Sequence, residues 1–386
     1  MSEMTVPKNV AAEIDHAIVQ QREGNGRNTV RHPAAAGALK IAHKRPMPGS
    51  LSAEALTPGV APSPLHNLVE RGGRTLQHLT YVNLYVGGKT AWAASDIQSI
   101  DRALAGAMTD PNLDDVINQY FHGGTVSTTA APSRILPDTK PRKVSRADID
   151  GLVQKNVVAT GLLNGFDPSS TVFNFLLPRG VVLTTDGGAQ AAAADRSTDQ
   201  PTVTTVTTIR SGNAVTTVTV ATSSAEAGAA SDGDGDSGGS GPLGGDPDDA
   251  DSSLGGLGGY HGSVHIDGTV VYFAVGVFSE RRQDGSENGI VAFDQPWKNV
   301  VATFYHELQE ARTDPDVEDA IRTKNLSFIG WNSNQGEEIG DFPVFEAFND
   351  GDLSEVFQEV PLKAGGTAPV QFMYSNRADG PEGPRT

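Results

Sequence analysis

The sequence has no cysteine, and this absence excludes several kinds of chemistry at once. A chain without thiols has no disulfide framework, no thiolate zinc site and no cysteine nucleophile. Positive charge is also scarce, because 29 lysines and arginines stand against 47 aspartates and glutamates, for a formal net charge of −18. Nucleic acids and anionic membrane surfaces bind clustered basic side chains. Neither is therefore an expected partner.

The chain also lacks any apolar run long enough to span a bilayer. Its first residues, Met1 to Val6, have neither the basic region nor the apolar core of a secretory signal. The sequence therefore predicts a cytoplasmic protein, with leaderless secretion as the alternative. At 386 residues the chain is long enough to bury a substantial hydrophobic core.

Composition divides the chain into one folded domain and several segments outside it. Residues 1–64 are poor in aromatic residues and rich in proline, which predicts a flexible leader. The domain itself is expected to span residues 65–378, followed by a short flexible tail at 379–386. Two insertions are expected to interrupt it, a β-hairpin at 186–222 and a disordered linker at 223–259.

The hairpin is predicted from threonine and valine residues that alternate on both sides of Arg210-Ser211-Gly212-Asn213. Its two strands are expected at Thr202 to Ile209 and at Ala214 to Thr222. The linker that follows consists almost wholly of glycine, aspartate, serine and alanine. Such a segment cannot bury enough apolar surface to become ordered.

The folded domain is predicted to be α+β, with a mixed β-sheet flanked by helices. Strands are expected at Leu79 to Val86, Thr171 to Leu177 and Val270 to Val275, which are rich in β-branched and aromatic residues. Helices are expected from about Ser95 to Met108 and from Asp114 to Phe121. A sheet layered with helices is the architecture against which a metal-binding helix can pack.

A further helix is predicted where the sequence reads His306-Glu307-Leu308-Gln309-Glu310. Apolar residues recur there at intervals of three and four, which is the helical period: Val301, Phe304, Leu308 and Ala311. The helix is expected to stop at Thr313-Asp314-Pro315, because the residue before a proline is pushed out of the α-helical region.

The polar side of this helix has the spacing of a metal site. Residues four apart lie on one face of a helix, so His306 and Glu310 can bind one metal ion. Glu307 would then act as the general base on the metal-bound water, as the intervening glutamate does in metalloproteases of the H-E-x-x-H type. The alternative is that these residues form an ordinary solvated helix face.

Two downstream segments extend the motif. Taken in order, H-E-L-x-E-A-x-T-D-P, then G-W with E-I-G-D, then V-Q-x-x-Y-S-N resembles the Exordium or phosphate-induced protein family and its bacterial relatives. The resemblance covers most of residues 65–378. It implies a zincin-like fold with an active-site helix and an H-E-x-x-E signature, which places the chain among candidate zinc metallopeptidases.

The resemblance also implies a set of site residues. His306 and Glu310 would be metal ligands, Glu307 the base, and Glu338 or Asp341 the third ligand. The chain departs from the family's pattern in three ways: it has no cysteine after Asp341, it carries an insertion at Val317 to Phe328, and it begins without an export signal.

A third protein ligand is needed because a catalytic zinc takes three and leaves one position open for water. For Glu338 and Asp341 the alternative is that both merely tie down the turn from Gly336 to Gly340. His261 is a further candidate ligand, although a structural histidine is the favoured interpretation there. Two carboxylates and one imidazole make a hard site, so manganese or calcium are alternatives to zinc.

The leading hypothesis from the sequence is a metal-dependent hydrolase that acts on peptide or protein substrates. The alternative is a non-catalytic binding or signalling module that keeps the fold, with a structural metal or with none. A free coordination position beside Glu307 would favour the enzyme. A fourth protein ligand that closes the site would favour the module.

Overall fold

The structure, a computed structural model, describes residues 57, 60–185, 206–211, 214–219, 252–323 and 325–385. Most of the predicted leader and the predicted linker up to residue 251 lie outside these ranges. Residues 188–245 form a unit of their own. Within that unit, β7 (Val206–Ser211) and β8 (Ala214–Thr219) form an antiparallel hairpin where the sequence predicts one.

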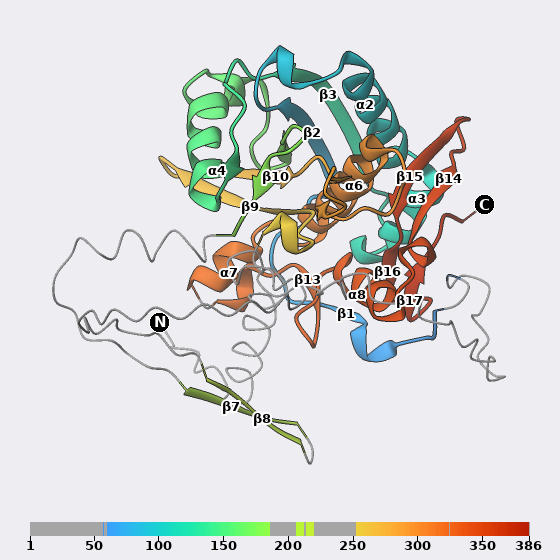
Figure 1. The fold of residues 1–386 in the computed structure, drawn as a ribbon. Helices are drawn as coiled ribbons and strands as arrows, with labels where there is room; N and C mark the ends of the chain where they lie inside the picture. Colours follow the sequence, from blue (N-terminus) through green and yellow to red (C-terminus); the bar gives the residue numbers. More distant parts are fainter. Residues whose placement is uncertain are drawn as a thin grey trace, which may run out of the picture. The chain divides into compact units, whose positions relative to one another are not determined.

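A five-stranded mixed sheet lies at the centre of the main unit, as expected for an α+β fold (Figure 1). Its strands follow the order β3 (Ser127–Ile135), β2 (His78–Tyr85), β5 (Thr171–Leu176), β10 (Thr269–Gly276) and β9 (Gly259–Ile266). The first four are parallel, whereas β9 runs antiparallel to β10 and forms one edge of the sheet.

Helices cover both faces of this sheet because alternate strand residues point to opposite sides. One face carries Tyr81 and Tyr272 and packs in a single buried cluster with α2 (Ala94–Met108) and α6 (Pro296–Thr313). The other face carries Phe173 and packs against α4 (Arg146–Val153). Figure 1 shows α4 on the side of the sheet away from α2 and α6.

The remaining elements surround these layers. The other helices of eight or more residues are α3 (Pro111–Asn118) and α8 (Asp341–Asp350), and a shorter one is α7 (Val317–Thr323). Three pairs of short strands tie loops together, namely β1 (Leu68–Glu70) with β13 (Trp331–Ser333), β4 (Lys143–Val144) with β6 (Val182–Leu183), and β11 (Glu280–Arg281) with β12 (Glu287–Asn288). No helix in the described part of the chain is long and apolar enough to cross a membrane.

Helix α6 is more deeply buried than its polar residues suggest. Its apolar stripe packs into the core as predicted, but Glu307, Glu310 and Arg312 are buried as well. The guanidinium group of Arg312 donates hydrogen bonds to the carbonyl oxygens of Gln77, just before β2, and of Ser127, the first residue of β3. The alternative of an ordinary solvated face is therefore wrong, because these polar side chains find partners inside the fold.

Residues 252–259 correct the predicted end of the disordered linker. Ser252 and Ser253 are buried, and Ser252 pairs with Thr184 in an antiparallel bridge. The hydroxyl of Ser253 donates to Asn288 and accepts from the backbone N–H of Leu183. A segment of glycine and serine is ordered here because distant residues satisfy its polar groups.

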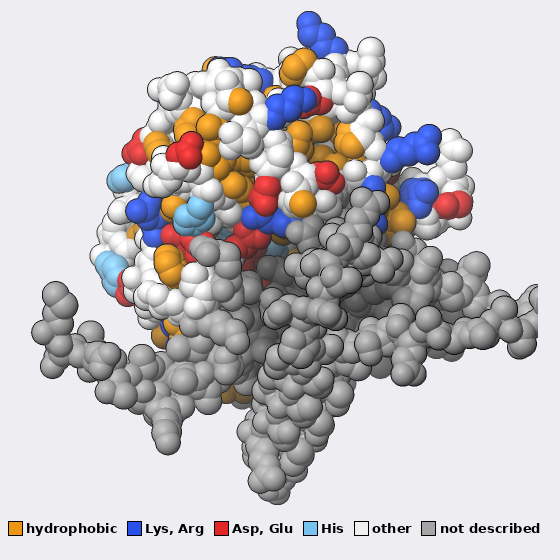
Figure 2. All heavy atoms as spheres, turned by 90° about the vertical axis from the view of Figure 1, so that its left-hand side faces the viewer, with side chains coloured by type: hydrophobic (Ala, Val, Ile, Leu, Met, Phe, Trp, Pro, Cys, Tyr) orange, Lys and Arg blue, Asp and Glu red, His pale blue; other side chains and the backbone are white. Residues whose placement is uncertain are grey.

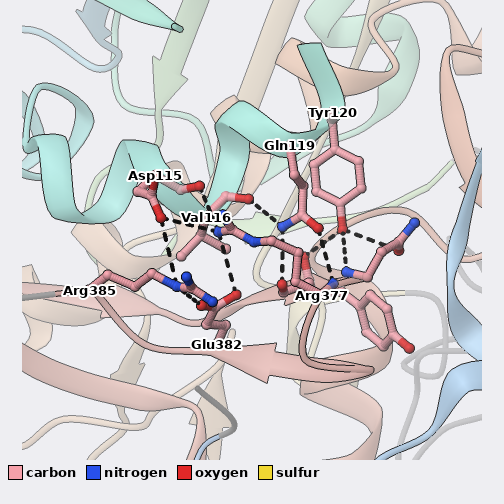
Figure 3. A network of polar contacts seen from close by, with 10 residues as sticks. Asp115, Val116, Gln119, Tyr120, Arg377, Glu382 and Arg385 are labelled. Atoms are coloured by element: carbon pink, nitrogen blue, oxygen red, sulfur yellow. Dashed lines mark hydrogen bonds and ion pairs between the residues drawn. The ribbon is translucent and has the colours of Figure 1, made fainter. Parts of the chain in front are cut away.

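The C-terminal residues correct the predicted flexible tail. After the hairpin of β14 (Phe357–Pro361) and β15 (Thr367–Gln371), β16 (Met373–Ser375) pairs with β17 (Gly380–Glu382). The side chain of Glu382 is fully buried and lies between Arg377 and Arg385 (Figure 3). A tail of mostly polar residues is thus fixed by ion pairs that its composition does not reveal.

Candidate metal centre

The candidate site lies where α6, β9, β15 and the start of α8 converge. Helix α6 contributes His306, Glu307 and Glu310, and the edge strand β9 contributes His261. Asp341 is the first residue of α8, and Glu338 precedes that helix. Gln371, the last residue of β15, completes the set. Five of these side chains fall into two groups that share Glu310, and Glu338 and Gln371 lie beside them.

The first group consists of His306, Glu310 and Asp341. Each offers one ligand atom, and the three atoms lie within 4.8 Å of one another. The closest approach is 3.1 Å between His306 Nε2 and Glu310 Oε2. The structure thus brings together both ligands predicted on the helix and one of the two candidates for the third ligand.

Gln371 determines which nitrogen of His306 faces this group. The amide nitrogen of Gln371 donates to the carbonyl oxygen of Gly340 at 2.6 Å, so its amide oxygen must point toward His306. That oxygen accepts the Nδ1–H of His306 at 2.7 Å. The neutral imidazole then carries its lone pair on Nε2, the atom beside Glu310. Metal-ligating histidines characteristically donate their other N–H to a carbonyl in this way.

The second group consists of His261, Glu307 and Glu310, all of them buried. The Nε2–H of His261 donates to the carbonyl oxygen of Asp314 at 3.1 Å. Nδ1 of the same ring lies 3.5 Å from Glu307 Oε2 and 3.6 Å from Glu310 Oε2. One imidazole and two carboxylates at these separations could hold a metal ion. His261 is buried and hydrogen-bonded, as the favoured structural interpretation expects, and it also belongs to a group that could hold an ion.

Glu338 belongs to neither group. Its Oε1 lies 3.4 Å from Nε2 of His261, on the far side of that ring from Glu307. Its backbone N–H donates to Oδ2 of Asp341 at 2.9 Å. Asp341 therefore does tie down the turn before α8, as the alternative interpretation proposed, and it reaches the ligand group as well. Asp341 is the better third ligand of the two.

Several buried carboxyl groups lie close together in the centre, and few positive charges are near enough to stabilise them. Burial raises the pKa of Asp341 to about 7, and it also raises the pKa of Glu307 and, strongly, that of Glu338. Although burial opposes the shift, His306 and His261 lower the pKa of Glu310 to about 2. Burial by itself lowers the pKa of His306, but the Glu310 carboxylate outweighs this effect and raises that pKa to about 10. Glu310 is thus the permanent anion of the site.

The donor set fits a divalent cation. Buried carboxylates repel one another unless protons or cations neutralise them, and a bound ion does so by displacing protons from its ligands. Oε1 of Glu338 is buried beside His261, at 3.4 Å from its Nε2, and has no hydrogen-bond partner among the described residues. Imidazole and carboxylate are common ligands of zinc.

A cavity of about 60 Å³ opens beside these side chains. His306, Glu307, Glu310 and Asp341 line one part of it, and the remainder of its wall is largely apolar. A site for one water needs about 10–15 Å³ of such volume, so the cavity has room for several waters or a small group of a substrate. The ligand group is therefore not sealed by protein on every side.

Comparisons with protein-family models, with curated proteins and with solved structures gave no match. The resemblance described above therefore remains a prediction from motifs.

Gln371 is the site residue that the sequence did not single out. It lies within the strand-like segment that contributes to the resemblance, but an amide in a strand carries no spacing signal of its own. Its partners, His306 and Gly340, come from separate elements. A buried amide is informative only when the groups that satisfy it are known.

The role of Gln371 gives a prediction for metal affinity. Exchange of Gln371 for leucine removes the acceptor of the His306 Nδ1–H and is expected to weaken metal binding by about 10- to 100-fold, the usual effect of losing such a partner. Isothermal titration of chelator-treated protein with zinc measures this change. Gln358→Leu is the matched control, because the side-chain amide of Gln358 on β14 donates to the nearby Ser354 and Glu355 carbonyls, outside the centre. Equal affinities in both variants would contradict the assigned role.

Proposed function

We propose that this protein is a zinc-dependent hydrolase that cleaves peptide bonds. The observation that carries the proposal is the group of His306, Glu310 and Asp341, whose ligand atoms lie within 4.8 Å beside a cavity that Glu307 also lines. These three residues would hold the ion. Zinc in such a site acts as a Lewis acid on a carbonyl and lowers the pKa of a water molecule.

Glu307 supplies the proton acceptor in this proposal. It follows His306 directly in α6 and reaches the same cavity, yet it is not one of the three ligands. Burial raises the pKa of Glu307, and a general base works best when its pKa lies closer to neutrality than that of a free carboxylate. His261, at 3.5 Å from Glu307 Oε2, holds that carboxylate in place.

The arrangement of the sheet supports a zincin-like assignment. Helix α6 packs against the sheet and presents its polar side toward β9, the antiparallel edge strand. An active-site helix beneath a mixed sheet is what the resemblance implies. Zinc is the proposed ion because of the histidine, and manganese or calcium are the alternatives that the two carboxylates favour.

One observation favours the alternative function, a non-catalytic module. The fully buried group of His261, Glu307 and Glu310 would use Glu307 as a ligand. An ion held there would leave no free carboxylate to act as a base. The location of the ion therefore distinguishes the enzyme from the module.

Chelation tests the proposed activity. Protein purified without chelators is expected to cleave members of a broad peptide library, as detected by mass spectrometry, and to stop after treatment with a chelator. Adding back zinc should restore cleavage. Cleavage that is equally fast without metal would contradict a metal-dependent mechanism. One bound ion per chain with no cleavage at all would favour the module.

A further inference from the structure

Helix α8 carries a metal-ligand candidate and an apolar surface on the same face. Asp341, Phe345 and Phe348 are spaced by four and three residues, so they lie one above another along the helix. All three line the cavity beside the metal centre. A molecule bound to the metal would therefore have the phenyl ring of Phe345 one helical turn away.

Phe345 has a surface that core packing does not account for. It is half-buried, and among the described residues it belongs to none of the three buried hydrophobic clusters. Its neighbour Val344, by contrast, packs in a cluster with Ala302 and Phe357. A buried phenyl ring normally packs in a hydrophobic core. The ring of Phe345 lines the cavity instead, so it is available to contact a ligand.

The wall of the cavity is partly polar and partly apolar. Thr303 and Gln371 line it together with the metal-ligand candidates, and Leu257, Ile290 and Phe357 line it together with Phe345. An engineered cavity of about 150 Å³ holds a benzene ring. At about 60 Å³, the cavity here is smaller and suits a short aliphatic group better than an aromatic one.

Side-chain contacts on the edge strand β9 hinder an extended polypeptide substrate from pairing with the sheet near the metal centre. Strand β9 is an edge strand, and an unpaired edge is where a polypeptide substrate could add as a further strand. Here the backbone N–H of Ser263 donates to Glu318 Oε2 at 3.3 Å, and the carbonyl oxygen of Ser263 accepts from Arg146 at 3.1 Å. Ser263 lies two residues beyond His261, so the edge is closed close to the metal centre.

The two side chains that close this edge also bind each other. Arg146 Nε donates to Glu318 Oε1 at 2.8 Å, and Glu318 belongs to α7, within the segment that the family resemblance marks as an insertion. Figure 2 views the molecule from the side of α4 and α7, where acidic, basic and histidine side chains lie next to one another. A long polypeptide would have to break these contacts to pair with β9.

We propose that the site takes short peptides that carry a small aliphatic side chain beside the scissile bond, and that Phe345 is the residue that selects this side chain. The proposal rests on the proposed function, since it assumes an ion held by His306, Glu310 and Asp341. The aliphatic group lies in the cavity against Phe345, and the peptide bond faces the metal-ligand candidates. Aromatic side chains are rejected by size.

Hydroxamic acids, which bind zinc, test the proposed preference for a small aliphatic side chain without requiring turnover. Calorimetric titration of the zinc-loaded protein compares acetohydroxamic acid, 4-methylpentanohydroxamic acid and 3-(2-naphthyl)propanohydroxamic acid. Each buried methylene adds about fourfold to affinity, so the isobutyl compound is expected to bind at least about tenfold more tightly than the acetyl compound. The naphthyl compound should gain nothing over the acetyl compound.

Phe345→Ala should weaken this selectivity, because removal of the ring enlarges the cavity. The isobutyl preference is expected to shrink and the naphthyl compound to bind better than it does to wild type. Phe166→Ala is the matched control, since Phe166 is a half-buried phenylalanine that packs on Phe173 on the other face of the sheet. It should leave the order unchanged. A general loss of stability would weaken all three compounds alike.

The outcomes separate the two proposals. Zinc content and acetohydroxamate binding report on the metal centre itself. If both are present but the isobutyl compound binds no better, or the naphthyl compound binds equally well, the substrate class is wrong and the metal site stands. If the protein takes up no zinc and binds no hydroxamate, the proposed function fails and the substrate class fails with it.

Discussion

Exchange of Glu307 for glutamine is expected to abolish hydrolysis while the metal stays bound. Glutamine is nearly isosteric with glutamate, so the buried position between α6 and β9 remains filled. The amide cannot accept the proton that a carboxylate base takes up. Loss of a positioned base costs about 10²-fold or more in rate, and this is the decrease expected in cleavage of the best peptide substrate. Steady-state kinetics and metal analysis of the same preparation measure both quantities.

Glu346→Gln provides the matched control for this experiment. Glu346 lies on α8 next to Phe345, but it is not among the residues that line the cavity. It should retain wild-type rates. If Glu307→Gln cleaves as fast as wild type, the base has been assigned wrongly. If it loses the metal, Glu307 is a ligand in the group with His261, which favours the non-catalytic module.

Loss of His306 or Asp341 is expected to remove the metal itself. Wild-type protein should hold about one divalent ion per chain, since one group of three ligands with an open position binds one ion. His306→Ala and Asp341→Ala each remove one of three ligands, an effect expected to exceed the 10- to 100-fold loss seen when only a ligand's hydrogen-bond partner is removed. Metal analysis after dialysis should therefore find almost none in either variant.

His265→Ala is the control for a lost imidazole. His265 lies on β9 and pairs with Asp319 at 2.6 Å, outside both ligand groups. It should keep the full metal content. His261→Ala then locates the ion. If His261→Ala retains the metal, the ion lies with His306 and Asp341. If His261→Ala loses the metal and His306→Ala keeps it, the ion lies in the buried group with His261.

Helix α6 and its chemistry could be predicted from the sequence because they depend on short-range geometry. The spacing of apolar residues and the proline at 315 predicted a helix that ends at Thr313, where α6 ends. The same 3.6-residue period places His306 and Glu310 on one face in any helical structure. The strands at 79–86 and 171–177 were likewise predicted within one or two residues, since each is a run of strongly β-forming residues.

The tertiary structure alone decided what surrounds this helix. Asp341, His261 and Gln371 meet His306 and Glu310 only because the path of the chain brings α8, β9 and β15 to one point. Asp341 and His261 were only two of several candidates from the sequence, and nothing local distinguished Gln371 from polar residues that bind water. The same reason explains the ordered C-terminal strand, where Glu382 is buried because arginines lie beside it.

The burial of polar groups is the property that the tertiary structure decides and that the sequence does not reveal. A charged side chain can leave water only where partners replace its hydration, and those partners come from distant parts of the sequence. The sequence therefore determined the secondary structure that carries the motif and the spacing of its first two ligand candidates. Packing decided that the motif faces the protein interior, which residues complete the centre, and that an apolar cavity opens beside it.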